Sequence, residues 1–316
     1  MSDFVELMKR GGNQAITINK PDGVDFHLTA RGSDWLWAAF CVFLVMAMIL
    51  IGLMFRKAPN ERLFYYTAIA PVFFIAINYF TLASNLGWTP IKAKYNHVTT
   101  TTQQEHPGYR QVFYSRYIGW FLAFPWPVIQ ASLLGGTPIW QIAFNVGLTE
   151  TWVVALLIAA LVKTTYKWGY YSFAIAAGVV ASISVMTTTR NLVKNMGKDV
   201  FQIFTCFYGV VMFLWGIYPI SFGLSEGGNV IQPNSEAVFY GILDVLLLGV
   251  VPCLFVALAS SVGLERLGYG PQAAFNPMPH EKTMNSIASA RNSGETAVST
   301  PKATPKPAKK AKKSKK

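Results

Sequence analysis

The chain has 316 residues, of which 52% are hydrophobic and only 13% are charged, and its mean hydropathy is +0.34. A soluble domain usually carries about 25% charged residues, so this composition excludes an ordinary soluble globular protein and indicates an integral membrane protein. Much of the net charge of +12 lies in the final residues, K-P-A-K-K-A-K-K-S-K-K. It is therefore a property of the tail and says little about the body of the chain.

Seven apolar runs follow one another along the body of the chain. As a helix that rises about 1.5 Å per residue, each run can cross a hydrocarbon core of about 30 Å. Backbone N–H and C=O groups in lipid must form their hydrogen bonds within the segment, so each run predicts a transmembrane helix. The runs are residues 35–55, 63–83, 113–134, 138–162, 168–187, 201–222 and 237–261. The sequence thus predicts an all-α seven-transmembrane-helix bundle over residues 35–263, preceded by an N-terminal segment, 1–34, and followed by a tail, 264–316.

The basic residues of the loops predict the orientation of the bundle. Loop 56–62, loop 188–200 and the Lys-rich tail all lie on one side of a seven-helix protein, and a Lys and Arg excess marks the cytoplasmic side. We therefore expect the N-terminus outside and the C-terminus in the cytoplasm. The Ser-, Thr-, Ala-, Pro- and Lys-rich tail is predicted to be disordered, and its basic cluster to bind anionic lipid, at about 1 kcal/mol per basic residue, and not nucleic acid.

Two carboxylates interrupt the apolar runs, and an ionised group in a membrane helix is paired or functional by default. Asp244 lies in the seventh run and Glu150 in the fourth. We expect Glu150 to face the bundle and bond to a neighbouring hydroxyl or amide, with a role in ion permeation as the alternative. Between the second and third runs, the β-branched centre of loop 88–111 predicts a short hairpin.

Three segments carry a family resemblance. S-R-Y-I-G-W-F-L-A-F-P-W-P-V-I-Q (115–130), W-G-I-Y-P-I-S-F-G-L-S-E-G (215–227) and E-x(7)-D-V (236–245) resemble segments of bacteriorhodopsin-like pumps, of the microbial rhodopsin superfamily. The N-terminal R-G-G-N-Q-A-I, residues 84–98 and 105–117, and the Lys-rich end resemble a non-pumping branch. This branch comprises the fungal opsin-related proteins, with the yeast thirty-kilodalton heat-shock membrane proteins. The resemblance implies a microbial rhodopsin-like fold in the plasma membrane.

The chain departs from the resembled pumps at three positions. The retinal-binding lysine of rhodopsins stands one helical turn after the aspartate of the seventh helix, where this chain has Leu248, and no lysine occurs between Lys198 and Lys282. An imine requires a primary amine, so the resemblance implies a protein without covalent retinal, and we expect no cofactor. Gly119 and Gln130 stand where the pumps have their primary proton acceptor and internal donor, and neither exchanges a proton usefully near neutral pH.

Other site residues are also assigned through the resemblance. Trp120, Pro125, Trp215, Tyr218 and Phe222 resemble the walls of the retinal pocket. They form either a pocket for an apolar ligand or a filled aromatic core.

The resemblance also places Arg116 and Asp244 face to face, as a predicted intramembrane ion pair. Glu226 and Glu236 match the outer proton-release acids of the pumps in spacing, with two solvated loop acids as the alternative.

Two functions from different classes follow. The resembled family implies a non-photoactive opsin-like protein, associated with stress, that modulates the plasma-membrane proton pump or membrane homeostasis. The alternative is an ion (proton) channel or transporter that uses Arg116, Asp244, Glu150, Glu226 and Glu236. We expect no enzyme and no metal site, because the sequence has no phosphate-binding Gly loop or nucleophile elbow and its histidines lack metal-ligand spacing.

Overall fold

The structure is a computed structural model, which describes residues 12–95, 97, 108–264, 267 and 269. Seven helical spans in this part are long and apolar enough to cross a membrane: Ala30–Phe55, Leu63–Ala83, Tyr114–Leu134, Ile139–Leu161, Lys167–Met196, Lys198–Gly227 and Pro233–Ala259. The predicted seven-helix fold is confirmed. The predicted Lys-rich tail lies outside the described residues, apart from Leu264, Leu267 and Tyr269.

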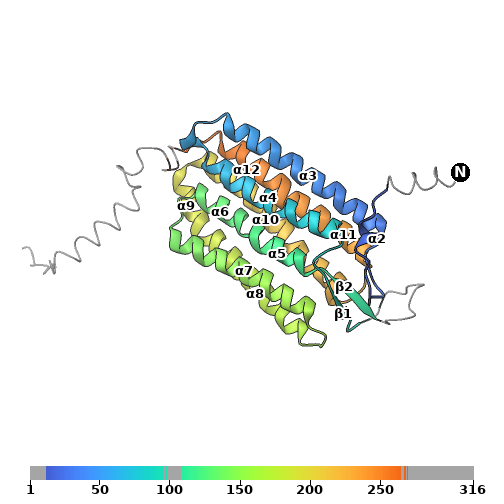
Figure 1. The fold of residues 1–316 in the computed structure, drawn as a ribbon. Coiled ribbons are helices and arrows are strands. Elements are labelled where there is room, and N and C mark those ends of the chain that lie inside the picture. The colour runs from blue at the N-terminus through green and yellow to red at the C-terminus, as the bar shows by residue number, and fades with distance from the viewer. Residues whose placement is uncertain (1–11, 96, 98–107, 265–266, 268, 270–316) are drawn as a thin grey trace, which may run out of the picture. The chain divides into compact units, whose positions relative to one another are not determined.

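The seven spans are built from helices in chain order (Figure 1). A short helix, α2 (Ala15–Ile18), precedes them, and η1 (Pro59–Glu61) links the first two spans. The spans are α3 (Ala30–Phe55); α4 (Leu63–Ala83); α5 (Tyr114–Ala123) with α6 (Pro125–Leu134); α7 (Ile139–Leu161); α8 (Lys167–Ser184), η2 (Val185–Thr189) and α9 (Arg190–Met196); α10 (Lys198–Phe222) with η3 (Gly223–Gly227); and α11 (Pro233–Asp244), η4 (Val245–Val250) and α12 (Val251–Ala259).

Several helices extend beyond the predicted apolar runs. The first begins at Ala30 instead of residue 35, the fifth continues to Met196, and the sixth runs from Lys198 to Gly227. Hydropathy marks only the part of a helix that lies in hydrocarbon, whereas the backbone hydrogen-bond ladder continues into the polar interface. The helix ends that were missed carry several of the site residues described below.

The third and seventh spans depart from regular α-helix at their centres. Pro125, which lacks a backbone N–H, follows Phe124 and separates α5 from α6. In the seventh span the π-helical segment η4, Val245–Val250, follows directly after Asp244 and contains Leu248. Single π-helical turns inside α-helices occur frequently at functional sites, so the break in the seventh span places Asp244 and Leu248 at a position of structural interest.

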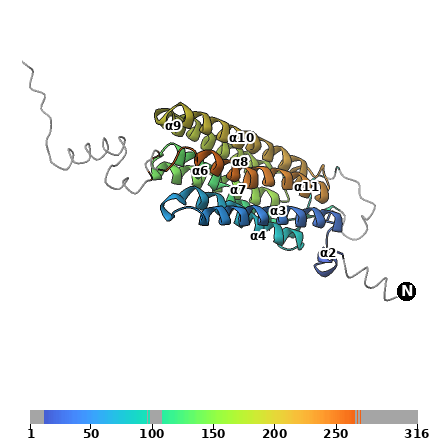
Figure 2. The ribbon, with the colours of Figure 1, turned by 90° about the horizontal axis from the view of Figure 1, so that it is seen from above.

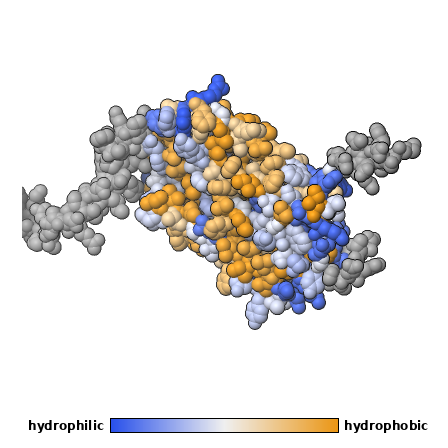
Figure 3. Space-filling view, viewed as in Figure 1, coloured by the Kyte–Doolittle hydropathy of each residue, from blue (hydrophilic) through white to orange (hydrophobic). Residues whose placement is uncertain are grey.

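The helices surround one core and expose apolar side chains outward. Figures 1 and 2 show α3 beside α4 and α7 beside α8. Figure 2 shows α10 and α3 along opposite sides of the bundle. Large apolar side chains such as Ile49, Phe213 and Ile220 are more than half exposed, and hydrophobic residues dominate the middle of the face in Figure 3. An apolar surface of this kind is what a helix bundle presents to acyl chains.

A two-stranded hairpin lies at one end of the bundle, called here the hairpin end. Strands β1 (Thr89–Lys92) and β2 (Tyr109–Val112) pair antiparallel, with Thr89 opposite Val112. The N-terminal segment joins them through a bridge between Phe26 and Arg110, and Gln111 accepts a hydrogen bond from the Leu28 backbone N–H at 2.8 Å. The predicted hairpin is confirmed, although most of its β-branched centre lies outside the described residues.

Candidate functional site

Four buried charged side chains meet at the hairpin end and are called here the ion cluster. They come from four elements: Arg110 from β2, Arg116 from α5, Glu226 from η3 and Glu236 from α11. Arg110 Nη2 lies 2.5 Å from Glu236 Oε2, and Arg116 Nη1 lies 2.9 Å from Glu226 Oε1. Arg116 Nη1 also pairs with Glu236 Oε1. Each carboxylate is therefore neutralised by at least one guanidinium.

Neutral donors complete the coordination of Glu226. The Tyr117 hydroxyl donates to Oε1 at 3.1 Å, and the Tyr240 hydroxyl donates to Oε2 at 3.2 Å. Ser225, the preceding residue, also donates to Oε2. Four donors hold this carboxylate when Arg116 is included, and hydrogen bonds that an ionised group accepts are stronger than neutral ones.

The ion cluster also ties the hairpin and the fifth span to the bundle. Arg110 Nη1 donates to Asn229 Oδ1 at 2.5 Å and to the Ile231 carbonyl at 2.8 Å, both in the loop between the last two spans. Lys167, at the start of α8, donates to the Glu226 backbone carbonyl at 2.6 Å. Three cations and two carboxylates are thus fixed in one buried network.

Asp244 lies deeper in the bundle and is bound by neutral groups. The Tyr79 hydroxyl donates to Oδ2 at 2.8 Å and the Tyr218 hydroxyl donates to Oδ1 at 2.7 Å. The Trp120 indole N–H lies 2.9 and 3.1 Å from the two oxygens. The carboxylate is fully buried, and three side chains from α4, α5 and α10 satisfy it.

The predicted Arg116–Asp244 ion pair is wrong. In the described structure every ion pair of Arg116 is to Glu226 or Glu236, and Asp244 is held by the three neutral donors. The guanidinium lies 4.5 Å from the ring centre of Tyr240, and this ring packs against Trp120 at 5.0 Å. An aromatic layer therefore lies between the arginine and the aspartate. The two acids at the hairpin end together attract the Arg116 guanidinium more strongly than Asp244 alone would.

The interpretation of Glu226 and Glu236 as solvated loop acids is also wrong. The two residues are only 5% and 1% exposed, and both lie in helical segments that extend past the predicted apolar runs. Burial of a carboxylate without a partner is costly, which explains why the arginines are drawn to them. Whether either acid exchanges a proton stays a prediction.

Glu150 does not form the predicted hydrogen bond. It is half-buried on α7, and its carboxylate forms no hydrogen bond or ion pair with any of the described residues. It belongs neither to the ion cluster nor to the Asp244 site. The described structure therefore does not join Glu150 to a polar path with the other acids.

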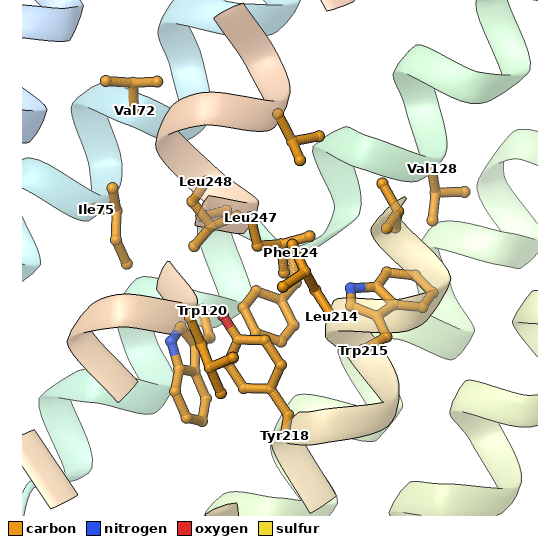
Figure 4. Close-up of a cluster of buried hydrophobic side chains, with 14 of the residues drawn as sticks. Val72, Ile75, Trp120, Phe124, Val128, Leu214, Trp215, Tyr218, Leu247 and Leu248 are labelled. Carbon is orange, nitrogen blue, oxygen red and sulfur yellow. The ribbon is translucent and has the colours of Figure 1, made fainter. Parts of the chain in front are cut away.

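Leu248 occupies an apolar site. It is fully buried, and Figure 4 shows it in a cluster with Val72, Ile75 and Leu247. In the described spans the lysines are Lys167, Lys194 and Lys198, all near helix ends. None of these lysines lies in the seventh span, where the resembled pigments carry their retinal-binding lysine.

Asn78 compensates sterically for the missing side chain at Gly119. A Cβ atom added at Gly119 would lie 2.5 Å from Asn78 Cγ, so the amide of α4 fills the space that a side chain on α5 would need. Neither the nitrogen nor the oxygen of the Asn78 side-chain amide has a hydrogen-bond partner in the described part of the chain. Gln130 donates to the Thr67 carbonyl at 3.1 Å, which links α6 to α4.

Aromatic rings fill the space between two of the predicted wall residues, Trp120 and Trp215. Trp120 and Trp215 are joined by two rings that were not predicted: Trp120 contacts Phe124 at 5.3 Å, Phe124 contacts Trp152 at 5.6 Å, and Trp152 contacts Trp215 at 5.1 Å. Tyr218 packs on Phe124 at 5.0 Å. Figure 4 shows Trp120, Phe124 and Tyr218 packed against one another, with Trp215 to one side.

The last two predicted wall residues are Pro125 and Phe222. Pro125 begins α6, and Phe222 stacks on Tyr171 at 5.5 Å.

Retinal does not fit this arrangement. A covalent bond would need an amine where Leu248 provides an aliphatic side chain. A polyene held between Trp120 and Trp215 would need the space that Phe124 and Trp152 fill. The missing amine and the packing of the rings therefore each argue against bound retinal.

Several site residues were not found from the sequence. The aromatic partners Phe124 and Tyr240 lie four residues from Trp120 and Asp244, so helical spacing could have placed them on the same faces. Arg110 and Lys167 could not have been found in this way, because each reaches the cluster through contacts with elements distant in sequence.

The fold and the two carboxylate sites define a class: a seven-helix membrane protein built like the microbial rhodopsins. The family model for bacteriorhodopsin-like proteins matches residues 32–247. The chain therefore belongs to the bacteriorhodopsin-like family, and it is a multi-pass membrane protein.

Two relatives and a solved structure place it within that family. The chain is 61% identical to protein YRO2 of Saccharomyces cerevisiae over 298 residues, covering 93% of this chain and 86% of that protein. It is 37% identical to the 30 kDa heat shock protein of the same yeast, covering 92% and 93%. The structure of a light-driven proton pump from Leptosphaeria maculans superposes with a TM-score of 0.70 at 26% identity, covering 77% of this chain and 99% of that one.

Proposed function

We propose that the chain is a non-photoactive, opsin-like plasma-membrane protein that acts in the stress response by modulating the plasma-membrane proton pump or membrane homeostasis. The observation that carries the first part is Leu248, an aliphatic side chain buried where a pigment needs an amine. The name of one relative, the 30 kDa heat shock protein, supports the association with stress. The proposed role involves no catalytic step and no retinal.

The closed polar network supports a structural or regulatory role over a pumping one. Each oxygen of Glu226, Glu236 and Asp244 accepts a hydrogen bond or ion pair. Gln130 is an amide and Gly119 has no side chain, so neither can relay a proton. A pump needs an acceptor and an internal donor that exchange protons in turn, and the residues at these two positions do not offer them.

The proposed orientation places the N-terminus outside and the Lys-rich end in the cytoplasm. Two segments with basic residues support it: the loop between α3 and α4, and the segment around α9. Both lie at the end of the bundle opposite the hairpin, and an excess of Lys and Arg is typical of the cytoplasmic side. The Lys-rich end would then bind anionic lipid of the inner leaflet. This contact would hold the tail near other proteins of that surface, the proton pump among them.

The proposal is tested in a fungal host from which the relatives have been removed. Glucose-driven acidification of the medium is measured before and after heat stress, with the full chain, with a version ending at residue 277, and with no chain. We expect the full chain to change pump-dependent acidification after stress and the shortened chain to do so less. Equal acidification in the three strains would refute the regulatory part of the proposal.

A proton channel is the second candidate, and one observation favours it. Buried groups that can exchange protons lie in succession from Asp244 through Tyr218 and Tyr240 to Glu226, with Tyr218 and Tyr240 rings 6.3 Å apart. Liposomes that contain the purified chain and a pH-sensitive dye decide between the two. Proton flux that Asp244→Asn abolishes would favour the channel, and flux no greater than that of empty liposomes would favour the first proposal.

A further inference from the structure

Glu150 takes no part in either carboxylate site, although it lies inside a span. The residue is half-buried, and its carboxylate forms no hydrogen bond or ion pair with any described residue. Neither of its oxygens is among the buried side-chain atoms without a partner in that part of the chain. The carboxyl group therefore reaches the outer surface of the bundle, on the edge that α7 and α8 form in Figure 1.

This carboxyl group lies near the middle of the membrane. Ile139 and Leu161, the two ends of α7, are equally far from Glu150 along the chain, about 16 Å on each side at about 1.5 Å per residue. Long basic side chains near helix ends can reach the polar interface, but a glutamate at mid-depth cannot. An unpaired polar group in hydrocarbon is costly, which favours a partner that lies in the membrane beside α7.

The residues around Glu150 form a continuous outward-facing row on α7, called here the outer seam. They repeat at alternating intervals of three and four residues, which is the spacing of one helix face. Trp140 and Val154 are 65% and 39% exposed. The outer seam consists of Trp140, Ala143, Gly147, Glu150, Val154 and Leu157.

The outer seam leaves room for another helix at close range. A Cβ atom added at Gly147, one turn before Glu150, would meet nothing within 4 Å. Ala143, one turn earlier, is exposed and adds only a methyl group. Small residues four positions apart let two membrane helices approach closely, and polar side chains then hydrogen-bond across the contact. A helix packed over Gly147 would cover Glu150 and shield it from the acyl chains.

The chemistry of the carboxyl group favours an identical partner. In its neutral form the group has one O–H donor and a carbonyl acceptor, so two of them can satisfy each other. A two-fold axis along the membrane normal brings the same patch of both subunits together, and it places both Glu150 side chains at one depth. A basic partner would have to hold its cation in hydrocarbon, which is costly in its own right.

We propose that the outer seam is the interface of a homodimer, in which α7 packs on α7 of a second copy of the chain. The two helices cross near Gly147, and the two Glu150 carboxyl groups hydrogen-bond to each other. From Trp140 to Leu157 the seam is about 26 Å long at about 1.5 Å per residue, so it follows most of a hydrocarbon core of about 30 Å. The dimer does not depend on the proposed role in stress.

The proposal is tested by energy transfer between donor- and acceptor-labelled full-length chains in liposomes, over a range of protein-to-lipid ratios. We expect transfer that rises with this ratio, saturates, and varies linearly with the acceptor fraction, as a dimer requires. Glu150→Leu removes the carboxyl group and should weaken association about 3- to 30-fold. Glu150→Gln keeps a donor and an acceptor and should stay within about threefold of the unchanged chain.

A matched pair of glycines tests the position of the interface. Gly147→Leu fills the crossing point and should weaken association about tenfold or more. Gly209→Leu makes the same change at an exposed glycine in the middle of α10, where a Cβ atom also meets nothing within 4 Å, and should have no effect.

Disulfide formation in host membranes gives a second measurement. In a chain with Cys41, Cys206 and Cys253 replaced by Ala, Gly147→Cys should yield a cross-linked dimer on oxidation, and Gly209→Cys should not.

Circular dichroism melting first confirms that each variant folds, and either leucine change on α7 decides the matter if the other does not fold. A chain that stays monomeric at every ratio, alone or bound through α7 to another membrane protein, overturns the proposal. So does association that Glu150→Leu and Gly147→Leu leave unchanged, or that Gly209→Leu weakens equally. Cross-linking at Gly209→Cys as efficient as at Gly147→Cys has the same consequence.

Discussion

Replacing Arg116 with Gln removes the cation that the two acids at the hairpin end share. Glu226 and Glu236 are buried. The change leaves the Glu226 carboxylate without an ion-pair partner, while the Glu236 carboxylate keeps only Arg110. The stacking of the guanidinium on Tyr240 at 4.5 Å is also lost. The perturbation therefore leaves a carboxylate desolvated and uncompensated, which is the costly case for buried charge.

The magnitude follows from this geometry. Removal of one partner from a buried pair costs about 3–5 kcal/mol. At about 2–4 °C per kcal/mol for a domain of about this size, we expect the unfolding temperature of Arg116→Gln to fall by about 6–20 °C. Arg56→Gln removes an exposed arginine from the loop after α3 and should change stability by less than about 0.5 kcal/mol.

A double-mutant cycle assigns the partner of Arg116. Unfolding is followed by circular dichroism in detergent at one heating rate for Arg116→Gln, Glu236→Gln, Asp244→Asn and the two combinations. Residues in contact couple by about 0.5–3 kcal/mol, whereas separated residues add within about 0.5 kcal/mol. We expect strong coupling of Arg116 to Glu236 and near-additivity with Asp244.

The reverse result would refute this reasoning. If Arg116 coupled more strongly to Asp244 than to Glu236, the aromatic layer of Tyr240 would not separate the two sites, and the direct ion pair that the sequence predicted would be present in the protein. An Arg116→Gln variant as stable as Arg56→Gln would show that the ion cluster contributes nothing to folding.

Three further predictions concern the core and the lone acid. Gly119→Ala places a Cβ atom against Asn78 and should cost about 1–3 kcal/mol by overpacking; Asn78→Ala in the same chain should restore at least half of the lost unfolding temperature, and no rescue would contradict the steric account. Leu248→Lys supplies an amine but leaves the ring-filled space, so with added retinal we expect a visible absorption band only when Phe124→Ala is combined with it; a band from Leu248→Lys alone would show that the rings leave room. Glu150→Gln removes a charge that has no partner among the described residues and should not lower the unfolding temperature; a fall of several degrees would reveal a bond that the structure lacks.

The fold followed from hydropathy, but the helix ends did not. Apolar runs located all seven spans because the bilayer imposes a minimum length and internal hydrogen bonding. They ended too early at Phe222 and began too late at residue 237, because Glu226 and Glu236 are polar although they lie in helix. Hydropathy therefore assigned these two acids to a loop, where the solvated interpretation was natural.

The site was predicted in part. Asp244 was recognised as a group that needs partners, since a charge inside a span requires them, and the structure supplies Tyr79, Trp120 and Tyr218. The wrong partner was assigned because a resemblance fixes which helices face each other but not the direction of a long side chain. Arg116 could extend toward either end of the bundle, and only the position of Glu236 decides it.

The resemblance also did not predict the rings that fill the core between Trp120 and Trp215. The resemblance identified Trp120 and Trp215 as the two walls of a pocket. What lies between them depends on Phe124, which the 115–130 motif contains but which was not recognised as filling the pocket, and on Trp152 from α7, which lies outside the motifs. Packing between distant segments is not encoded in the spacing of one helix.

The central claim is that this bundle cannot hold retinal covalently, and one measurement tests it most directly. The purified full-length chain is incubated with all-trans retinal, reduced with borohydride to trap any imine, digested and analysed by mass spectrometry. The account predicts no reduced adduct on any residue of the seven spans, while a bacteriorhodopsin-like pigment treated in parallel gives one. A stoichiometric adduct on a residue inside the bundle would contradict the account.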